Sequence, residues 1–380
     1  MGILEETSTT TAGVATGYLT YFCGKISALN NLTGKNKAVA YWLLLGVGMI
    51  IIQILLGGIT RLTGSGLSIT EWKPIMGAWP PVGNEAWQEA FEKYQQIAQY
   101  KYINNHFTID DFKFIFFWEW FHRLWARLLG VVFAIPFIYF LIKKYFSRDM
   151  VIPLIILFIL GGIQGLIGWI MVSSGLNDTN LYVNHFKLAI HFISALILLC
   201  YTLWFALKLL IPQRQIITHP SLHRFLLFTI VLLTVQLIYG AFMAGLKAAM
   251  AAPTWPDING DMIPPGLLHN SWFSYPINVH FVHRGLAYLL FIIIIVGYVK
   301  IRKAAKQAQV TTLGKSALWM LGLVITQVVL GIVTVLSAPQ IVPGHFALFE
   351  MLAELHQLVA MSLLMACITS IFLIRNTGDA

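Results

Sequence analysis

Residues 114–142 have the sequence FIFFWEWFHRLWARLLGVVFAIPFIYFLI, an apolar run long enough to cross a lipid bilayer as one helix. The run nevertheless contains a carboxylate, Glu119, and a histidine, His122, three residues later. Ionisable side chains are costly inside a membrane, and those that occur there usually serve a function. This stretch therefore predicts a membrane-spanning helix that carries part of a functional site.

The composition of the whole chain agrees with this interpretation. Of the 380 residues, 58% are hydrophobic and 11% are charged, whereas soluble domains average about 25% charged residues. We therefore expect an all-α integral membrane protein. Eight apolar segments are long enough to span the bilayer: residues 38–60, 114–142, 151–173, 184–211, 222–246, 276–300, 314–337 and 347–374.

The distribution of charge predicts the orientation of these helices. One side would hold residues 1–37, the connections between spans 2–3, 4–5 and 6–7, and the C-terminus. Together with the helix ends next to it, that side carries 15 of the 25 Lys and Arg residues but only 4 of the 16 Asp and Glu residues. Basic loops stay in the cytoplasm, so we expect a multi-pass protein of the bacterial inner (plasma) membrane with both termini cytoplasmic. The net charge of +9 is divided among short loops, which does not indicate a nucleic-acid partner.

Four of the histidines in the even-numbered spans form two related pairs, one histidine from each span. His283 follows His122 by 161 residues, and His356 follows His191 by 165 residues. With both termini inside, each histidine falls within the first third of a helix that starts at the outer face. The pattern indicates a duplicated bundle with one site in each half, both toward the outer face.

A second repeat supports the duplication. The odd-numbered spans each contain a Gln-x-x-x-Gly motif, which begins at Gln53, Gln164, Gln236 and Gln327. Gln and Gly four residues apart share a helix face, and ordinary helix packing explains each motif taken alone. We therefore expect two pseudo-repeated four-helix bundles, residues 38–211 and 212–380, preceded by a cytoplasmic N-terminal segment, residues 1–37.

The outer loop of the first half, residues 61–113, is long. Loops of this length are usually functional or disordered. Residues 84–100 within it repeat apolar side chains at helical spacing. This spacing predicts an amphipathic helix on the outer surface, or a lid over a site.

Histidines on two neighbouring helices at one depth are typical of a haem with two axial imidazoles. His122 with His191 would ligate one iron, and His283 with His356 would ligate a second. Zinc would need a third or fourth ligand, and only the first pair has a carboxylate nearby. Zinc is therefore the weaker alternative.

The two halves differ one turn before the first histidine of each pair. Glu119 precedes His122 in the first half, whereas His280 occupies the corresponding position in the second. A carboxylate beside a haem ligand is suited to proton transfer, which indicates a reactive first site and a redox cofactor in the second. The alternative is that Glu119 lies among lipid headgroups and pairs with Arg123 or Lys113.

Several basic and aromatic residues are candidates for contacts with haem propionates or with the outer loops. They are Arg61, Trp72, Arg123 and Arg284. A cation beside a haem can pair with a propionate, but a basic residue near the interface can equally extend its charged end toward water. The sequence leaves both interpretations open.

The motifs around these residues resemble those of heme A synthase, in the form shared by many bacteria and mitochondria. The similarity extends from about residue 40 to residue 365. Its most specific stretches are GGITRLTGSGLSITEWKPIMGAWPP, FKFIFFWEWFHRLWARLLG, GWIMVSSGL, LAIHF, VHFVHRGLAY and ELHQ.

This resemblance implies that a methyl group of haem O is oxidised to a formyl group, giving haem A for cytochrome oxidase. It implies that His122 and His191 hold the substrate haem O, with Glu119 in the reaction. It implies that His283 and His356 bind a haem b that relays electrons. It also implies a haem O synthase as the supplier of substrate, and an electron donor that the sequence does not identify.

Some positions depart from the usual pattern of that family. Lys247 and Pro253 stand where an acid and an Asn are frequent, and His280 stands where a Gln is usual. The loop cysteine pair of the shorter bacterial form is also missing, so a redox-active disulfide is not expected. The sequence assigns no role to His280 or His345.

Two other functions are compatible with histidine pairs. A two-haem electron carrier of the cytochrome b type would explain both pairs, but not a carboxylate in one half only. A haem transporter would suit an internal duplication, but no broken helix stands out near the bilayer centre.

Overall fold

The computed structural model describes residues 34–73, 76–342 and 346–376, and its eight long helices are apolar enough to cross a membrane. Each corresponds to one predicted span, so this part of the fold prediction is confirmed. The eight helices are α2 (Gly34–Leu62), α4 (Ile109–Ile142), α5 (Arg148–Ser173), α6 (His185–Leu210), α7 (Pro220–Gly245), α8 (Pro276–Gln307), α9 (Thr311–Ser337) and α10 (Leu348–Phe372).

Local signals explain where several helices begin. Thr108 caps α4 in a capping box, because its side chain accepts from the backbone N–H of Asp111 and the Asp111 carboxylate accepts from Thr108. Asn184 caps α6 in a similar way. The capping box starts α4 at Ile109 instead of 114. His122 consequently lies more than a third of the way along α4, a correction to the predicted position.

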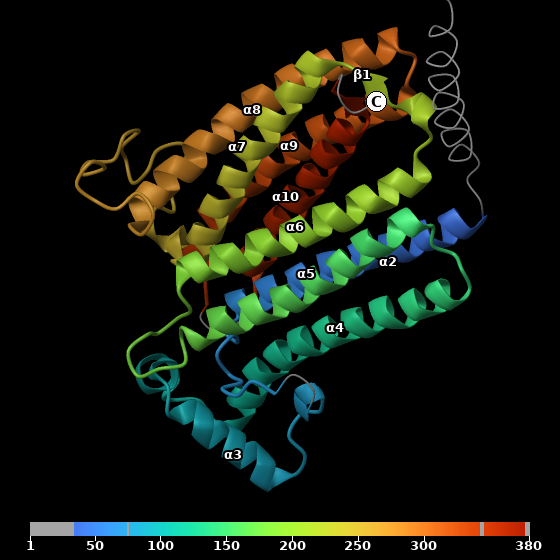
Figure 1. Cartoon of the computed structure of the whole chain (residues 1–380). Coiled ribbons are helices and arrows are strands. Elements are labelled where there is room, and N and C mark those ends of the chain that lie inside the picture. The colour runs from blue at the N-terminus through green and yellow to red at the C-terminus, as the bar shows by residue number, and fades with distance from the viewer. Residues whose placement is uncertain (1–33, 74–75, 343–345, 377–380) are drawn as a thin grey trace, which may run out of the picture.

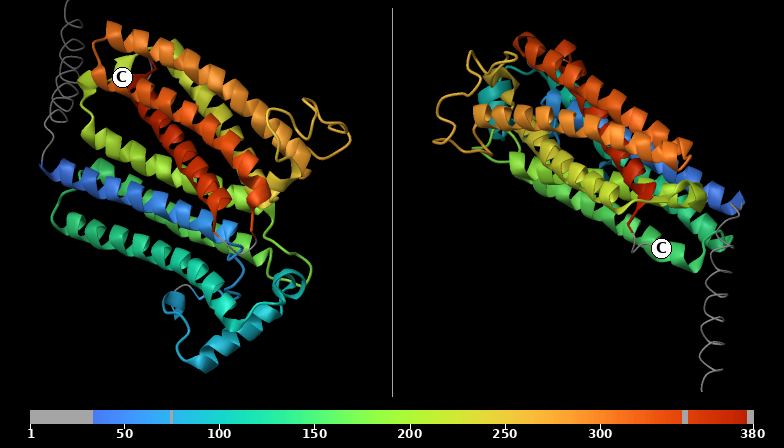
Figure 2. Two further views of the ribbon diagram at one scale, coloured as in Figure 1. Left: turned by 180° about the vertical axis from the view of Figure 1, so that it is seen from behind. Right: turned by 90° about the horizontal axis from the view of Figure 1, so that it is seen from above.

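The long helices run side by side in two groups (Figures 1 and 2). In the first group α2 packs against α4 and α6, and α5 packs against α6. In the second group α8 packs against α7 and α9, and α9 packs against α10. Contacts of α6 with α7, and of α10 with α2 and α6, join the groups.

The two groups differ in how closely their two middle helices pack. The helices α4 and α5 make few contacts with each other, whereas α8 and α9 pack together along the bundle.

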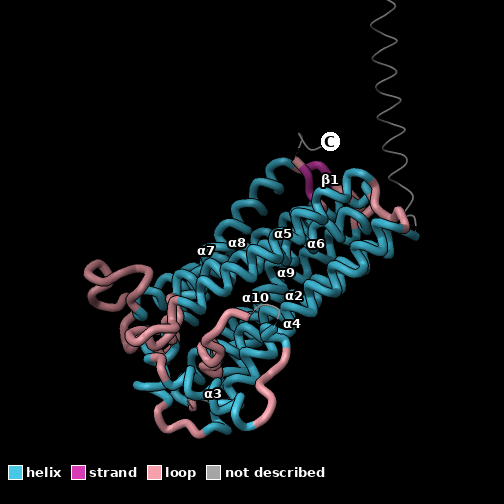
Figure 3. The backbone as a smooth tube through the Cα atoms, turned by 60° about the horizontal axis from the view of Figure 1, so that its bottom comes forward, coloured by secondary structure: helices cyan, strands magenta, loops and turns pink. Residues whose placement is uncertain are grey.

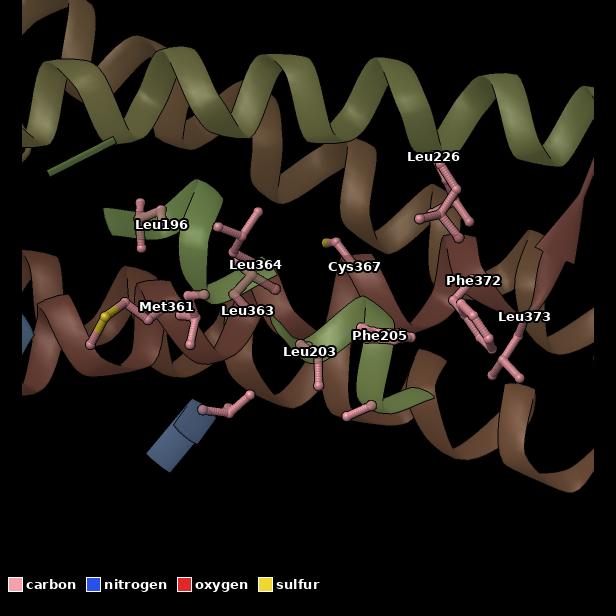
Figure 4. Packing of buried hydrophobic residues seen from close by; sticks show 14 of the residues in the cluster. Leu196, Leu203, Phe205, Leu226, Met361, Leu363, Leu364, Cys367, Phe372 and Leu373 are labelled. Atoms are coloured by element: carbon pink, nitrogen blue, oxygen red, sulfur yellow. The ribbon is translucent and has the colours of Figure 1, made fainter. Parts of the chain in front are cut away.

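The core lies where the two groups meet. Figure 4 shows α6 and α10 contributing side chains such as Leu203, Phe205, Leu364 and Cys367, all of them buried. Helices inside a lipid bilayer associate through close packing, so small residues at their contacts matter. Gly245 of α7 is one example, because a Cβ there would lie 2.6 Å from the His185 Cβ atom.

The connections at the two ends of the bundle differ in length. At one end they are long and gather together, as Figure 3 shows. They contain the short helices η1 (Met76–Ala78), α3 (Asn84–Gln95), η2 (Tyr100–Asn104), η4 (Ala248–Ala251) and η5 (Ala338–Gln340). The predicted amphipathic helix is thus α3. Its Phe91 and Tyr94 are buried against Phe112 of α4, which fixes the long loop to the bundle.

The opposite end has short connections and the described C-terminal end of the chain. There η3 (Gln213–Gln215) leads into β1 (Ile217–Thr218), which pairs in parallel with β2 (Ile374–Arg375). This two-residue pairing is a small departure from the all-α prediction. It ties the connection between the two groups to the end of α10. Residues 1–33 and His345 lie outside the described residues.

Candidate functional site

All four predicted histidines pack against the glycine of a Gln-x-x-x-Gly motif on the preceding membrane helix. A Cβ on the glycine would lie close to the imidazole Cε1: 3.2 Å for Gly57 and His122, 2.8 Å for Gly168 and His191, 3.5 Å for Gly240 and His283, and 3.0 Å for Gly331 and His356. A Cβ would clash with the ring at Gly168 and crowd it at Gly331 and Gly57, whereas the 3.5 Å at Gly240 is an ordinary contact. The motifs that ordinary packing explained therefore position the candidate ligands.

The glutamines of the first group also bind these histidines. Gln53 places its Nε2 atom 3.2 Å from both ring nitrogens of His122 and 3.3 Å from the His122 carbonyl oxygen. Gln164 donates from Nε2 to the His191 carbonyl oxygen at 2.9 Å and lies 3.2 Å from the His191 Nδ1 atom. The Gln164 Oε1 atom accepts from Ser194 Oγ at 2.5 Å. The Gln164 amide is thus held at both ends.

In the second group the two histidine rings face each other. The ring centroids of His283 and His356 are 6.5 Å apart. Because a metal–imidazole bond measures about 2 Å, two axial imidazoles on one metal have centroids roughly 6 Å apart. The spacing therefore suits one iron between the two rings.

The glutamines of the second group are less constrained. Gln236 Nε2 lies 3.5 Å from His283 Nε2, and Gln327 Nε2 lies 3.1 Å from His356 Nε2. Among the described residues, neither amide oxygen and neither histidine Nδ1 atom has a hydrogen-bond partner. These atoms could pair with each other if the side chains turned.

The donor sets fit haem better than zinc. Within the described ranges, no group of three or more His, Cys, Asp or Glu side chains comes together, whereas zinc needs three or four ligands. An iron-binding imidazole needs an acceptor for its outer N–H, and the Gln236 and Gln327 amides, whose oxygens have no partner among the described residues, lie beside the rings of the second group. The residues present therefore fit a haem with two axial histidines.

Glu119 lies on the same helix face as His122 and is only 2% exposed. Its Oε2 atom accepts from Ser68 Oγ and from the backbone N–H of Ile69, both at 2.8 Å, and its Oε1 atom accepts from Arg123 Nη2 at 2.6 Å. These three donors fix the position of the carboxylate. Glu119 therefore attaches the start of the long loop to α4 beside His122.

The Arg123 guanidinium is hydrogen-bonded to other residues of the chain. Besides Glu119 it contacts the loop backbone, donating to the carbonyl oxygens of Ile69 at 3.1 Å and Glu71 at 3.2 Å. The alternative pairing of Glu119 with Arg123 is therefore present, although Glu119 is buried. Lys113, the other predicted partner, pairs with Asp110 instead.

The second group anchors its outer loop in a corresponding way, but without a carboxylate. His280 Nε2 lies 2.7 Å from the carbonyl oxygen of Ala248. Arg284 donates to the carbonyl oxygens of Ala252 at 2.7 Å and Asp257 at 2.8 Å. His280 and Arg284 therefore anchor the second loop as Glu119 and Arg123 anchor the first. The sequence had left His280 without a role.

The remaining candidates contact loops and helix ends. Arg61 Nη2 donates to the Ala244 carbonyl oxygen, which connects α2 to α7. Trp72 stacks on Trp169, with ring centroids 5.4 Å apart and an interplanar angle of 17°. The Arg123 guanidinium lies 6.0 Å from the Trp169 ring centre. In this structure these residues organise the outer loop.

A buried carboxylate near His356 was missed from the sequence. Glu354 on α10 is 9% exposed, and its Oε2 atom has no hydrogen-bond partner among the described residues. It lies directly against Gly58 of α2, and nearby Gln357 donates to the Ile54 carbonyl oxygen at 3.2 Å. Glu354 therefore lies where α10 packs on α2, beside the glycine that follows Gly57, the neighbour of His122. Its position two residues before His356 was the available signal.

Comparison with known proteins identifies the family of this chain. A family model of cytochrome oxidase assembly proteins, COX15-CtaA, matches residues 40–368. The chain belongs to the COX15-CtaA family. This match includes all four histidines and Glu119.

Several curated relatives of this COX15-CtaA protein are named heme A synthase. That of Parvibaculum lavamentivorans is 39% identical over 319 residues, covering 82% of this chain and 90% of the relative. That of Bartonella henselae is 40% identical over 348 residues, covering 89% and 93%. That of Nitrosomonas eutropha is 40% identical over 325 residues, covering 83% and 89%.

Proposed function

We propose that this chain is a heme A synthase, a membrane enzyme that oxidises the methyl group of haem O to a formyl group. The observation that carries the proposal is the similarity to heme A synthases over most of the chain. The geometry supports it, since each predicted haem ligand rests on a Gln-Gly helix face.

We assign the two histidine pairs different tasks. His122 and His191 would hold the substrate haem O, because Glu119 lies one turn from His122 in this half only. His283 and His356 would hold a haem b, since their rings are spaced for two axial ligands. When bound, this haem b supplies one-electron transfer.

The task of Glu119 follows from its hydrogen bonds. Conversion of a methyl to a formyl group replaces C–H bonds by a C=O bond, so protons have to move at the site together with the electrons. A carboxylate has about four acceptor positions, and Ser68, Ile69 and Arg123 use three. The remaining position can hold a proton in transit beside His122. Arg123 and the loop hold the carboxylate in place for this step.

The enclosing loop has a complementary task. The segment around Ile69 is attached to Glu119 and Arg123, and α3 is packed on α4. Closing an outer loop over a reactive site restricts the access of water. We therefore assign the longer loop to the half in which haem O is oxidised.

The cellular setting of the proposal follows from the charge pattern. Both termini would be cytoplasmic and the haem sites would lie toward the outer face, because the basic residues concentrate on one side. Haem O would come from a haem O synthase in the same bilayer. An electron donor, not identified by this chain, would supply electrons through haem b.

Extraction of haem from cells tests the function. The full chain is expressed with and without a source of haem O, and the extracted haems are identified by mass. We expect hydroxylated and formyl products only when both the chain and haem O are present. Recovery of unmodified haem alone would favour the two-haem electron carrier.

A further inference from the structure

The two middle helices of each group correspond to each other, yet they pack differently. In the second group α8 lies against α9 along the bundle, whereas in the first group α4 and α5 make few contacts. Two of their side-chain contacts lie far apart along the helices. At the inner contact, the rings of Phe133 and Phe158 stack with centroids 5.9 Å apart. At the outer contact, the Arg123 guanidinium lies 6.0 Å from the Trp169 ring centre.

The stretch between these contacts begins at the depth of the first histidine site. The outer contact is one residue after His122 on α4 and one residue after Gly168 on α5. The inner contact is 11 residues after His122 and 10 residues before Gly168, which corresponds to about 15 Å along each helix. We call the residues between the contacts, 124–132 of α4 and 159–168 of α5, the α4–α5 window. It extends from the histidine site toward the middle of the bilayer.

Glycines line the facing surfaces of the window. Gly162 and Gly165 follow Phe158 by four and seven residues and therefore share its face of α5. Gly130 precedes Phe133 by three residues and shares its face of α4. A Cβ on any of these three glycines would have no neighbour within 4 Å beyond its own helix backbone. Glycines that let two helices approach closely would meet the other helix, so close packing does not explain these three.

The second group has large apolar residues at the corresponding positions. Corresponding residues are 161 apart between α4 and α8, as for the histidines, and 163 apart between α5 and α9, as for the Gln-x-x-x-Gly motifs. In the order Gly130, Gly162, Gly165, the counterparts of the three glycines are Phe291, Ile325 and Val328. Phe291 packs against the main hydrophobic core. The second group is thus filled where the first is open.

This difference between the groups matches the difference between the two haems assigned to them. Haem O carries a long isoprenoid chain where haem b has a vinyl group. Paired histidines can hold the porphyrin in either group, but the chain needs additional apolar space that leads away from the iron. The window provides this space beside the first site, because Gly168, which contacts the His191 ring, lies at its outer end.

We propose that the α4–α5 window holds the isoprenoid chain of haem O, and that its three glycines make the first site selective for haem O over haem b. The inference rests on the proposed function, in which the first histidine pair holds haem O. The window also borders the lipid, since Ile163 and Leu166 beside the α5 glycines are 45% and 46% exposed. The chain can therefore enter sideways from the bilayer, without crossing the outer loops.

Binding of the two haems to the purified full chain tests the proposal. Haem O and haem b are titrated separately, and the part of the binding that is lost in His122→Ala is assigned to the first site. Gly165→Val copies the second group, and we expect it to weaken haem O binding about tenfold, a loss of the size that overpacking produces. Binding of haem b at the first site should stay unchanged, because haem b has no chain to displace.

Further variants separate the size of the side chain from a general structural effect. Gly165→Ala adds a single methyl group and should weaken haem O binding less than Gly165→Val. Gly162→Ile also copies the second group and should reduce haem O binding as Gly165→Val does. Gly322→Val is the matched control, because Gly322 on α9 also has nothing within 4 Å of its Cβ position but lies outside the window. It should change the binding of neither haem.

Photolabelling locates the isoprenoid chain without any substitution. The unmodified full chain is loaded with a haem O analogue that carries a photoreactive group at the end of its isoprenoid chain, and the labelled residues are identified by mass spectrometry. Label within residues 124–132 or 159–168 would support the proposal, and it decides the matter if the glycine variants do not fold. Label confined to other helices would overturn it.

The outcomes distinguish the proposal from the function on which it rests. Full haem O binding in both Gly165→Val and Gly162→Ile would overturn the proposal and leave the window to lipid acyl chains. Equal losses of haem O and haem b in Gly165→Val would contradict it as well, since the change would then lie in the histidine site. Absence of haem A from cells that contain haem O and the unmodified chain would overturn the proposed function instead, even if the first site prefers haem O.

Discussion

Glu119 and Arg123 form an ion pair of 2.6 Å inside α4, where Glu119 is almost completely buried. The pair holds the first outer loop beside the first histidine site through the Ile69 backbone. In the second half, His280 and Arg284 hold their loop without a carboxylate. A carboxylate in the first half and an imidazole in the second therefore anchor the loops in the same way. Only the first half has a carboxylate that can accept a proton.

This difference predicts the behaviour of Glu119 variants. Glu119→Ala and Glu119→Gln should abolish haem A formation while haem stays in the second site, because that site makes no contact with Glu119. Glu119→Gln can keep the loop contacts, so its loss of activity would separate proton transfer from loop anchoring. Haem extraction and the reduced absorption spectrum measure the two properties. Asp110→Ala, which removes a surface ion pair with Lys113, is the control and should be active.

A second prediction concerns the glycine beneath His191. Gly168→Ala would place a Cβ 2.8 Å from the imidazole, so the ring or the helix has to move. Overpacking of this kind costs about 1–3 kcal/mol of folding stability. The haem A yield should fall as well, because His191 is displaced. Gly322→Ala on α9 is the matched control, since nothing lies within 4 Å of its Cβ position.

Thermal unfolding and haem A yield check the glycine prediction. Gly322→Ala should be neutral or more stable, because alanine favours a helix over glycine by up to about 1 kcal/mol. Equal melting temperatures and equal yields for the two variants would show that the close contact with His191 has no consequence.

A third prediction concerns the pH dependence of the outer loop. Hydrogen bonds from Lys73 and from Lys93 hold the pKa of the Glu71 carboxyl below its usual range. A carboxyl with a lowered pKa in the folded state stabilises that state above its unfolded pKa, and this contribution is lost as the pH falls. Because Lys93 belongs to α3, protease cleavage within residues 63–108 should increase below about pH 4, near the unfolded pKa of Glu.

Limited proteolysis across an acid pH series, with an acid-stable protease, tests the loop prediction. Glu71→Gln should show high cleavage at neutral pH already and little further change in acid. Glu92→Gln, which alters a different exposed carboxylate of α3, should follow the unmodified chain. A Glu71→Gln profile identical to that of the unmodified chain would contradict the prediction.

The membrane helices were predictable because length and apolarity determine a span. The starts of α6 and α8 agree with prediction to within one residue. The start of α4 was predicted too late, because its first turn is polar and its capping box at Thr108 precedes the apolar run. Hydropathy alone does not detect such a turn.

The candidate ligands could be picked out of the sequence, but their surroundings could not. Histidines in membrane spans stand out by their cost, whereas contact between Gln164 and His191 depends on the rotation of α5 and α6 about their axes. Glu354 was missed for a similar reason, because its position against Gly58 requires α10 to pack on α2. The sequence left open whether Arg123 faces solvent, a carboxylate or a propionate. In the structure it pairs with Glu119 and donates to carbonyl oxygens of the loop backbone.

The central claim is that one histidine pair holds the haem that is changed and the other holds a haem that stays. Comparison of His122→Ala with His283→Ala, each expressed with a source of haem O, tests it most directly. The account predicts that His122→Ala keeps low-spin haem b and makes no haem A, whereas His283→Ala loses that haem b. Haem A from His122→Ala, or a full haem b spectrum from His283→Ala, would contradict it.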